Sequence, residues 1–366
     1  MRQIIIDFGL VDIGGSTLPI RIYGYGLMLV LGFALGIVLA RRRARRFGES
    51  PEVATNIGLI ALVGGIVGAR LAFVIERWPT EFAHRPQPLV EMLNVTSGGL
   101  IYHGGLLLAT LLVVAYLRLR RLSIRRYLDI VAPSMMIGLG FGRLGCLLNG
   151  CCFGGVCPAD FPLAMRFPYA SAPLAVVGSA GNPLGGSSVS PAYSQHVAKG
   201  LLTPPDWLVA RDAQGRPRSE PREGPRLRLP SDLTVAEAGQ ARHERSLPVQ
   251  PSQALSATGA FLLAGLLLAF SRLRRREGQV FAVLVTAYPV FRFFEESLRG
   301  DNPHDLFRGV LTHSQYEAIA MVAVGLVLLL ACRKLPAVAG PYWKERQAAK
   351  APPPASTGNR RKGKKS

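Results

Sequence analysis

Residues 138–155 of the chain read GLGFGRLGCLLNGCCFGG. This stretch ends a long apolar segment, yet it holds one arginine, one asparagine and three cysteines among seven glycines. Apolar segments precede and follow it, so we expect this polar cluster to lie in or beside a membrane. An ionisable side chain is costly there, and its presence indicates a functional site.

The composition of the whole chain agrees with a membrane protein. Of the 366 residues, 49% are hydrophobic, and long apolar runs alternate with short clusters of arginine. The formal net charge of +20 does not predict a nucleic-acid partner, because the basic clusters lie at the ends of apolar runs, where positive-inside anchoring explains them. The pattern predicts an all-α integral membrane protein.

About seven transmembrane helices are predicted, since about 20 apolar residues are needed to cross a bilayer. They lie at about 20–40, 53–75, 98–117, 127–150, 254–271, 279–298 and 315–332. Three arginine clusters and the C-terminal region hold 24 of the 43 basic residues, all on one side of this arrangement. By the positive-inside rule, the N-terminus is periplasmic and the C-terminus cytoplasmic in a bacterial inner membrane.

Four regions follow from these spans. Residues 1–154 hold helices 1–4 after a short, turn-rich start with no cleavable signal peptide, and residues 254–335 hold helices 5–7. Residues 155–253 form a periplasmic insert with ten basic and eight acidic residues. Its middle, about 176–246, is predicted to be loosely structured by composition. Residues 336–366 form a basic cytoplasmic tail.

Three polar groups lie where hydropathy alone would not place them. The first is His103, which is either functional or a histidine at the membrane interface. The second is Arg143 with Asn149, where the alternative is an arginine that snorkels to the interface. The third is Arg292, Glu296 and Arg299, where the alternative is an ion pair within one helix. Two arginines against one carboxylate leave a positive charge, which suits an anion such as a lipid phosphate.

Four cysteines fall within twelve residues on the outward side: Cys146, Cys151, Cys152 and Cys157. Disulfides in an oxidising compartment are the first interpretation. A metal site and a catalytic thiol are alternatives, although the spacing matches no standard zinc pattern. The fifth cysteine, Cys332, lies on the other side.

Six motifs follow one another along the chain. They are YGLMLVLGF from Tyr25, GARLAFVI with Arg70, GGLIYHGG with His103, GLGFGRLGCLLNG with Arg143 and Asn149, PSQ at 251–253, and FRFFEESLRGD with Arg292, Glu296 and Arg299. In this order they resemble the motifs of the prolipoprotein diacylglyceryl transferase family. The fourth resembles the family signature GRxGNFxNGE. The chain departs from the family at Cys146 and Cys151, which stand where the signature has Asn and Glu, and at Gln250, Leu255 and Ser256 around PSQ.

The resemblance implies an enzyme that moves a diacylglyceryl group from phosphatidylglycerol to the lipobox cysteine in the signal peptide of a prolipoprotein. It implies no metal and no organic cofactor. The catalytic residues expected are His103, Arg143, Arg292 and Glu296. The substrate-binding residues expected are Tyr25, Arg70, Arg143, Asn149, Gly154 and Arg299.

Two other functions stay open on the sequence. A non-catalytic paralogue could bind anionic lipid or lipoprotein precursors without turnover. A small transporter is the other alternative, but no internal repeat relates two halves of the chain, and the polar groups lie toward the ends of spans rather than at the midplane.

Overall fold

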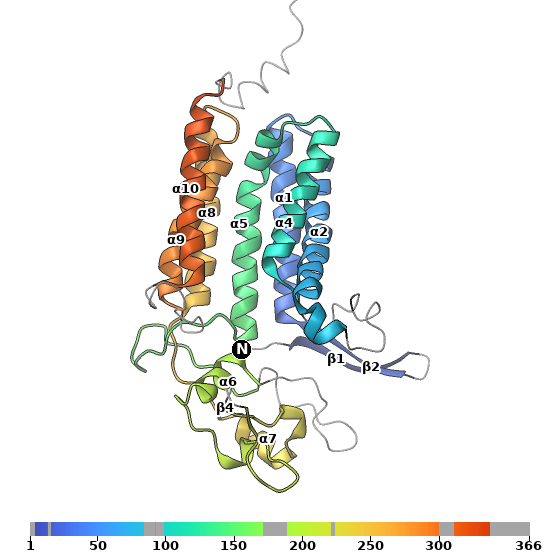
Figure 1. Ribbon diagram of the computed structural model, residues 1–366, viewed down its shortest axis with the longest axis vertical. Helices are drawn as coiled ribbons and strands as arrows, with labels where there is room; N and C mark the ends of the chain where they lie inside the picture. The colour runs from blue at the N-terminus through green and yellow to red at the C-terminus, as the bar shows by residue number, and fades with distance from the viewer. Residues whose placement is uncertain are drawn as a thin grey trace, which may run out of the picture.

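Seven long helices run side by side in the computed structural model, which describes residues 4–13, 16–83, 92, 99–170, 189–220, 224–299 and 311–336 (Figure 1). They are α1 Gly24–Arg46, α2 Pro51–Arg77, α4 Tyr102–Leu119, α5 Ile124–Asn149, α8 Ser252–Leu273, α9 Gln279–Ser297 and α10 His313–Arg333. Six are long and apolar enough to cross a membrane, and α9 is the exception. It holds three charged residues within 19, yet it packs against α5, α8 and α10. A helical, multipass membrane protein is thus confirmed.

The first span differs from the prediction at its start. A β-hairpin of β1 Ile4–Ile13 and β2 Ser16–Tyr23 precedes it, and α1 begins at Gly24 rather than near residue 20. Isoleucines and valine in β1 and β2 favour extended backbone, and the hairpin takes up apolar residues that hydropathy alone assigned to the helix.

Helix α5 lies at the centre of the bundle (Figure 1). It packs against α1 on one side and α8 on the other, while α4 packs on α2 and α10 packs on α9. The α2–α4 contact is close because glycines meet there: a Cβ added at Gly68 would lie 2.4 Å from the carbonyl oxygen of Gly104. The glycines on the two helices thus permit this close contact.

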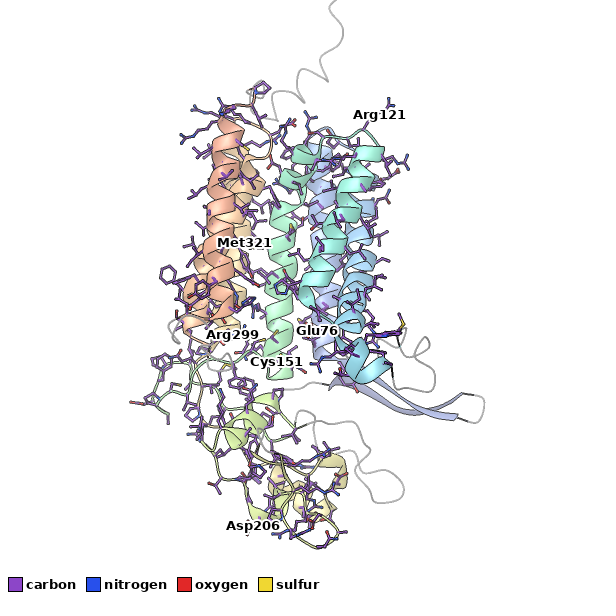
Figure 2. All side chains as sticks on the ribbon, viewed as in Figure 1. Glu76, Arg121, Cys151, Asp206, Arg299 and Met321 are labelled. Carbon is purple, nitrogen blue, oxygen red and sulfur yellow. The ribbon has the colours of Figure 1, made fainter. Side chains whose placement is uncertain are left out.

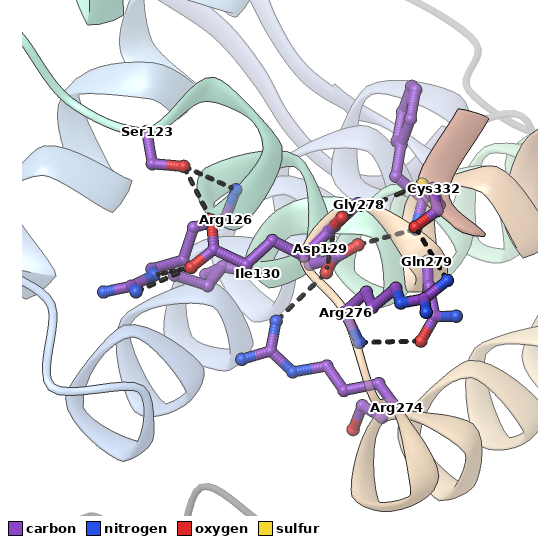
Figure 3. Close-up of polar contacts among 12 residues, drawn as sticks. Ser123, Arg126, Asp129, Ile130, Arg274, Arg276, Gly278, Gln279 and Cys332 are labelled. Atoms are coloured by element: carbon purple, nitrogen blue, oxygen red, sulfur yellow. Dashed lines mark hydrogen bonds and ion pairs between the residues drawn. The ribbon is translucent and has the colours of Figure 1, made fainter. Parts of the chain in front are cut away.

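Arginines gather at the end of the bundle where α1, α4, α8 and α10 finish, which we call the arginine end; Arg121 marks it in Figure 2. Asp129 of α5 is fully buried there and accepts hydrogen bonds from the backbone N–H of Gly278 at 2.8 Å and of Phe281 at 2.9 Å (Figure 3). It therefore caps the N-terminus of α9. Arg274 pairs with the same carboxylate at 3.0 Å.

The opposite end, where α2, α5 and α9 finish, carries the insert and is called the insert end. Past α2 lies a short helix, η1 Trp78–Phe82. The insert holds α6 Pro191–Ala198, η3 Asp206–Leu208, β3 Ser219–Glu220, β4 Gly224–Pro225, η4 Pro230–Asp232 and α7 Val235–Ala241.

The described part of the insert has a hydrophobic core of its own, built around Tyr169, Tyr193, Leu208 and Leu233. The predicted loose structure over 176–246 is therefore wrong for residues 189–220 and 224–246. The many Pro, Gly and Arg residues make the average composition of the insert polar. The insert nevertheless contains a few large apolar side chains, and these suffice to form a small core. Residues 171–188 and the tail beyond 336 lie outside the described residues.

Candidate active site

Five charged residues from α5, α9 and the turn after α9 form one connected group near the insert end, which we call the arginine–glutamate ladder: Arg143, Glu295, Arg292, Glu296 and Arg299. Arg143 comes from α5, and its Nη2 lies 3.7 Å from Oε1 of Glu295 on α9. The same oxygen lies 3.4 Å from Nη1 of Arg292. Glu295 thus joins two helices through their arginines.

The second half of the ladder continues along α9. Nη2 of Arg292 lies 2.5 Å from Oε2 of Glu296, and Nη1 of Arg299 lies 3.9 Å from the same oxygen. Glu296 is only 2% exposed. Spacings of three and four residues place these side chains on one helix face. Three guanidinium groups share two carboxylates, so the ladder keeps one net positive charge.

A pocket of about 510 Å³ opens at the insert end of α5. Its lining includes Tyr23 and Tyr25 at the start of α1, and Asn149 with Cys146, Cys151 and Cys152 around the end of α5. Of the residues predicted to bind substrate, the pocket therefore brings together Tyr25 and Asn149. Arg143 lies one helical turn before Cys146 on α5.

The sulfur atoms of Cys146, Cys151 and Cys152 all lie within 4.8 Å of one another. We call this group the thiol cluster. Hydrogen bonds from the Cys146 and Cys151 thiols, with the charges of Arg299 and Arg143, lower the pKa of the Cys152 thiol.

The predicted disulfides are not formed. All five cysteines are free thiols in the structure, and Cys157 is buried away from the cluster, where its backbone N–H donates to the carbonyl of Pro248.

The PSQ segment supports the loop that carries the thiol cluster. Oγ of Ser252 donates to the carbonyl of Cys152 at 2.8 Å, and Nε2 of Gln253 donates to the carbonyl of Cys151 at 2.9 Å. Next to it, Gly154 bonds through its N–H to the carbonyl of Gln250 at 3.2 Å. A Cβ at Gly154 would lie 2.6 Å from that carbonyl oxygen, so the glycine permits this close approach.

His103 and Arg70 have partners away from the pocket. Nε2 of His103 lies 2.9 Å from Oε1 of Glu317 on α10, and the histidine side chain is 62% exposed. Arg70 donates to the carbonyls of Met92 at 2.9 Å and Gly99 at 3.1 Å, so it supports the connection between α2 and α4. Neither residue lines the pocket.

Comparisons with known proteins identify the family of this chain. The sequence model of the prolipoprotein diacylglyceryl transferase family matches residues 14–331. The chain belongs to this family. Among its relatives are proteins named phosphatidylglycerol–prolipoprotein diacylglyceryl transferase from Rhodopirellula baltica, 29% identical over 87% of this chain and 74% of the relative, and from Bdellovibrio bacteriovorus, 28% identical over 89% and 93%. A third, from Clostridium tetani, is 24% identical over 84% and 92%.

The sequence did not indicate three residues that take part in the contacts around the predicted site. Glu295 lies beside the predicted Glu296, and only its spacing of three from Arg292 could have indicated an ion pair. Ser256 donates its Oγ hydrogen to Glu295, although it stood out only as a departure from the family motif. Glu317 pairs with His103 from 214 residues away, and no local pattern signals such a contact.

Proposed function

We propose that the protein transfers the diacylglyceryl group of phosphatidylglycerol to the lipobox cysteine of prolipoproteins. The substrate thiol attacks the carbon of the diacylglyceryl group that is bonded to the phosphate. A thioether forms, and the headgroup leaves as glycerol phosphate. Membership of the family and the names of the relatives support this reaction.

The observation that carries the proposal is the arginine–glutamate ladder. Negative charge develops on the phosphate oxygens as the carbon–oxygen bond breaks, and a buried site with fixed cations stabilises that charge more than water does. Arg143 and Arg292 hold the phosphate in this proposal, because an arginine fork matches phosphate oxygens. Glu295 and Glu296 keep the two guanidinium groups in place.

The other predicted residues have supporting roles in the proposal. His103 accepts the proton of the substrate thiol, with Glu317 orienting its ring. Tyr25 and Asn149 in the pocket bind the glycerol or headgroup oxygens. Arg299 extends the positive charge toward the substrate, while Arg70 and Gly154 contribute through the loops that they hold.

The membrane orientation is part of the proposal. The arginine end faces the cytoplasm of a bacterial inner membrane by the positive-inside rule, and the insert end faces the periplasm. The N-terminus is then periplasmic and the C-terminus cytoplasmic. The pocket at the insert end is in reach of a signal peptide and of lipid in the outer leaflet.

Complementation tests the function in cells. A host whose own transferase is depleted accumulates unmodified prolipoprotein, and expression of this chain should restore the thioether on the lipobox cysteine. Arg143→Ala should not restore it while still inserting in the membrane. Lipid binding without any thioether product would instead favour the non-catalytic paralogue and overturn the proposal.

A further inference from the structure

The thiol cluster lies at the pocket and has no role in the reaction described so far. Cys146 belongs to α5, and Cys151 and Cys152 follow just after the helix ends at Asn149. Figure 2 shows Cys151 at the insert end of α5. All three cysteines line the 510 Å³ pocket, so a ligand held by their sulfurs would be accessible to a substrate there.

The backbone is shaped to bring the three sulfurs together. Gly150 ends α5 with φ 75°, and Cys152 has φ 58°, in the left-handed region that non-glycine residues rarely adopt. Such conformations persist where the surroundings impose them and are frequent at ligand sites. Here the buried side chains of Ser252 and Gln253 hold the carbonyls of Cys152 and Cys151.

We propose that Cys146, Cys151 and Cys152 bind a zinc ion, and that the open fourth position of this ion binds the thiol of the substrate cysteine. The second half of this inference rests on the proposed function, whereas the metal site itself does not.

The geometry of the cluster fits zinc. At a zinc–sulfur distance of about 2.3 Å in a tetrahedral site, neighbouring sulfurs lie about 3.8 Å apart. The three sulfurs are already within 4.8 Å of one another, so small rotations of the side chains complete the site.

The number of ligands distinguishes a reactive site from a structural one. Structural zinc sites have four protein ligands, while catalytic sites have three and keep one position for water or substrate. Within the described part of the chain, the group contains three ligand residues and no fourth His, Cys, Asp or Glu. The pocket lies against these same residues, which gives the substrate thiol a route to the open position.

Zinc converts the substrate cysteine to the thiolate that the reaction needs. A free thiol has a pKa of about 8.5, but a thiol bound to zinc loses its proton outright. Zinc has no redox chemistry, so it activates the sulfur without oxidising it.

The step balances as an alkylation at sulfur. The thiol proton passes through water to His103, which lies outside the pocket, and the zinc-bound thiolate uses its electron pair to form the new carbon–sulfur bond. The carbon–oxygen bond to phosphate breaks, and glycerol phosphate leaves with that bond's electron pair beside Arg143 and Arg292. The thioether product carries no negative charge, so it binds zinc weakly and can leave.

The metal content of the purified full-length chain tests the site independently of activity. We expect about one zinc per chain in the wild type, and a loss of at least fivefold in Cys146→Ser, Cys151→Ser and Cys152→Ser. The matched control is Cys332→Ser, at the arginine end, which should keep its zinc. A wild-type chain without zinc, with copper in its place, or with a disulfide between cluster cysteines would overturn the site.

Cobalt substitution tests the fourth position. A cobalt-loaded chain should show thiolate-to-cobalt charge-transfer absorption that increases when a lipobox peptide is added, and not when the same peptide carries serine instead of cysteine. An absorption spectrum unaffected by the cysteine peptide would overturn binding of the substrate thiol to the metal.

A chelated chain separates this inference from the proposed function. If the zinc-free chain lipidates the peptide at the full rate, the metal's role is wrong and the transferase function stands. If the zinc-loaded chain binds the cysteine peptide but never forms a thioether, the site stands and the transferase function is wrong.

Discussion

At the scale of single residues, Glu295 connects the charged side chains of the site across three helices. It lies on α9, but its carboxylate contacts Arg143 of α5 as well as Arg292 of its own helix, and Ser256 of α8 donates a hydrogen bond to it. Three helices therefore meet at one buried carboxylate. Such a connection fixes the direction of both guanidinium groups before any lipid arrives, which lowers the cost of orienting them during the reaction.

Replacing either phosphate-binding arginine should remove most of the activity. We expect Arg143→Ala and Arg292→Ala to lower kcat/KM by about 10²- to 10³-fold, the loss typical when one charge-stabilising donor is removed. Arg292→Lys should also be poor, since an ammonium group cannot make two parallel contacts to phosphate. The control is Arg118→Ala, an exposed arginine at the arginine end. Rates of peptide lipidation measure the effect, and near-normal activity of either alanine variant contradicts the phosphate role.

The pairing of His103 with Glu317 gives a second prediction. If His103 takes the thiol proton, His103→Gln should slow lipidation about 10²-fold, within the range for general acid–base catalysis. Glu317→Gln should cause a smaller loss in the same direction, because Glu317 contacts the ring of His103 and takes no proton from the substrate in the proposal. A normal rate for His103→Gln would remove the histidine from the mechanism and leave the interface interpretation.

At the scale of elements, α9 shows how a helix with buried charges is kept in a bundle. Its three charged residues exclude it from the apolar spans, and burying an ion pair in an apolar span is costly. At the insert end of α9, the ion pairs of the arginine–glutamate ladder offset the cost of burying these charges. At the arginine end, Asp129 stabilises α9 because it caps the first turn and pairs with Arg274.

Removing this cap should destabilise the protein strongly. Asp129→Ala leaves Arg274 without its carboxylate and two N–H groups without their acceptor, so we expect a loss of about 3–5 kcal/mol of stability. Asp206→Ala, the same substitution at an exposed position of the insert, should leave stability unchanged. Thermal unfolding in detergent compares the two, and equal melting temperatures for both variants would contradict the capping role.

At the scale of the whole molecule, the site forms where two groups of helices and the insert meet. Helices α1, α2 and α4 lie on one side of α5, and α8, α9 and α10 lie on the other (Figure 1). The pocket lies between the start of α1 and the end of α5, and the ladder lies between α5 and α9. The pocket and the ladder thus both depend on the position of α5 relative to α1 and α9.

The insert should lose stability in acid in two steps. Burial, with the charge of Lys199, lowers the pKa of His196, so stability from its neutral form is lost as the pH falls below about 6.5. Hydrogen bonds from Arg228 and the N–H of Thr234 lower the pKa of Glu237 to about 2 from 4.5, so its contribution is lost between about pH 4.5 and 2.

Fluorescence of Trp207, which packs on the core of the insert, should report both steps. Glu237→Gln should weaken the insert at neutral pH and remove the lower step only. An unchanged acid profile in this variant would show that Glu237 does not stabilise the insert.

The sequence predicted the parts of this molecule that depend on local patterns. Apolar runs and arginine clusters marked the helices, and the cost of a buried charge singled out Arg143, Arg292 and Glu296. Contacts between distant segments could not be predicted in this way: Asp129 reads as an ordinary acidic residue near a helix start, and Glu317 as one in an apolar span. The core of the insert was hidden because a few tyrosines and leucines decide it, whereas the average composition is polar.

We propose above all that this chain forms a thioether at the expense of phosphatidylglycerol. The direct measurement uses the purified protein in bilayers that contain phosphatidylglycerol, with a synthetic lipobox peptide and mass spectrometry of the products. We expect a peptide heavier by one diacylglyceryl group, linked through its cysteine, and one glycerol phosphate released for each modified peptide. Bilayers of phosphatidylcholine alone should give no product. If a correctly folded chain loaded with zinc releases no glycerol phosphate and forms no modified peptide, it is not this transferase.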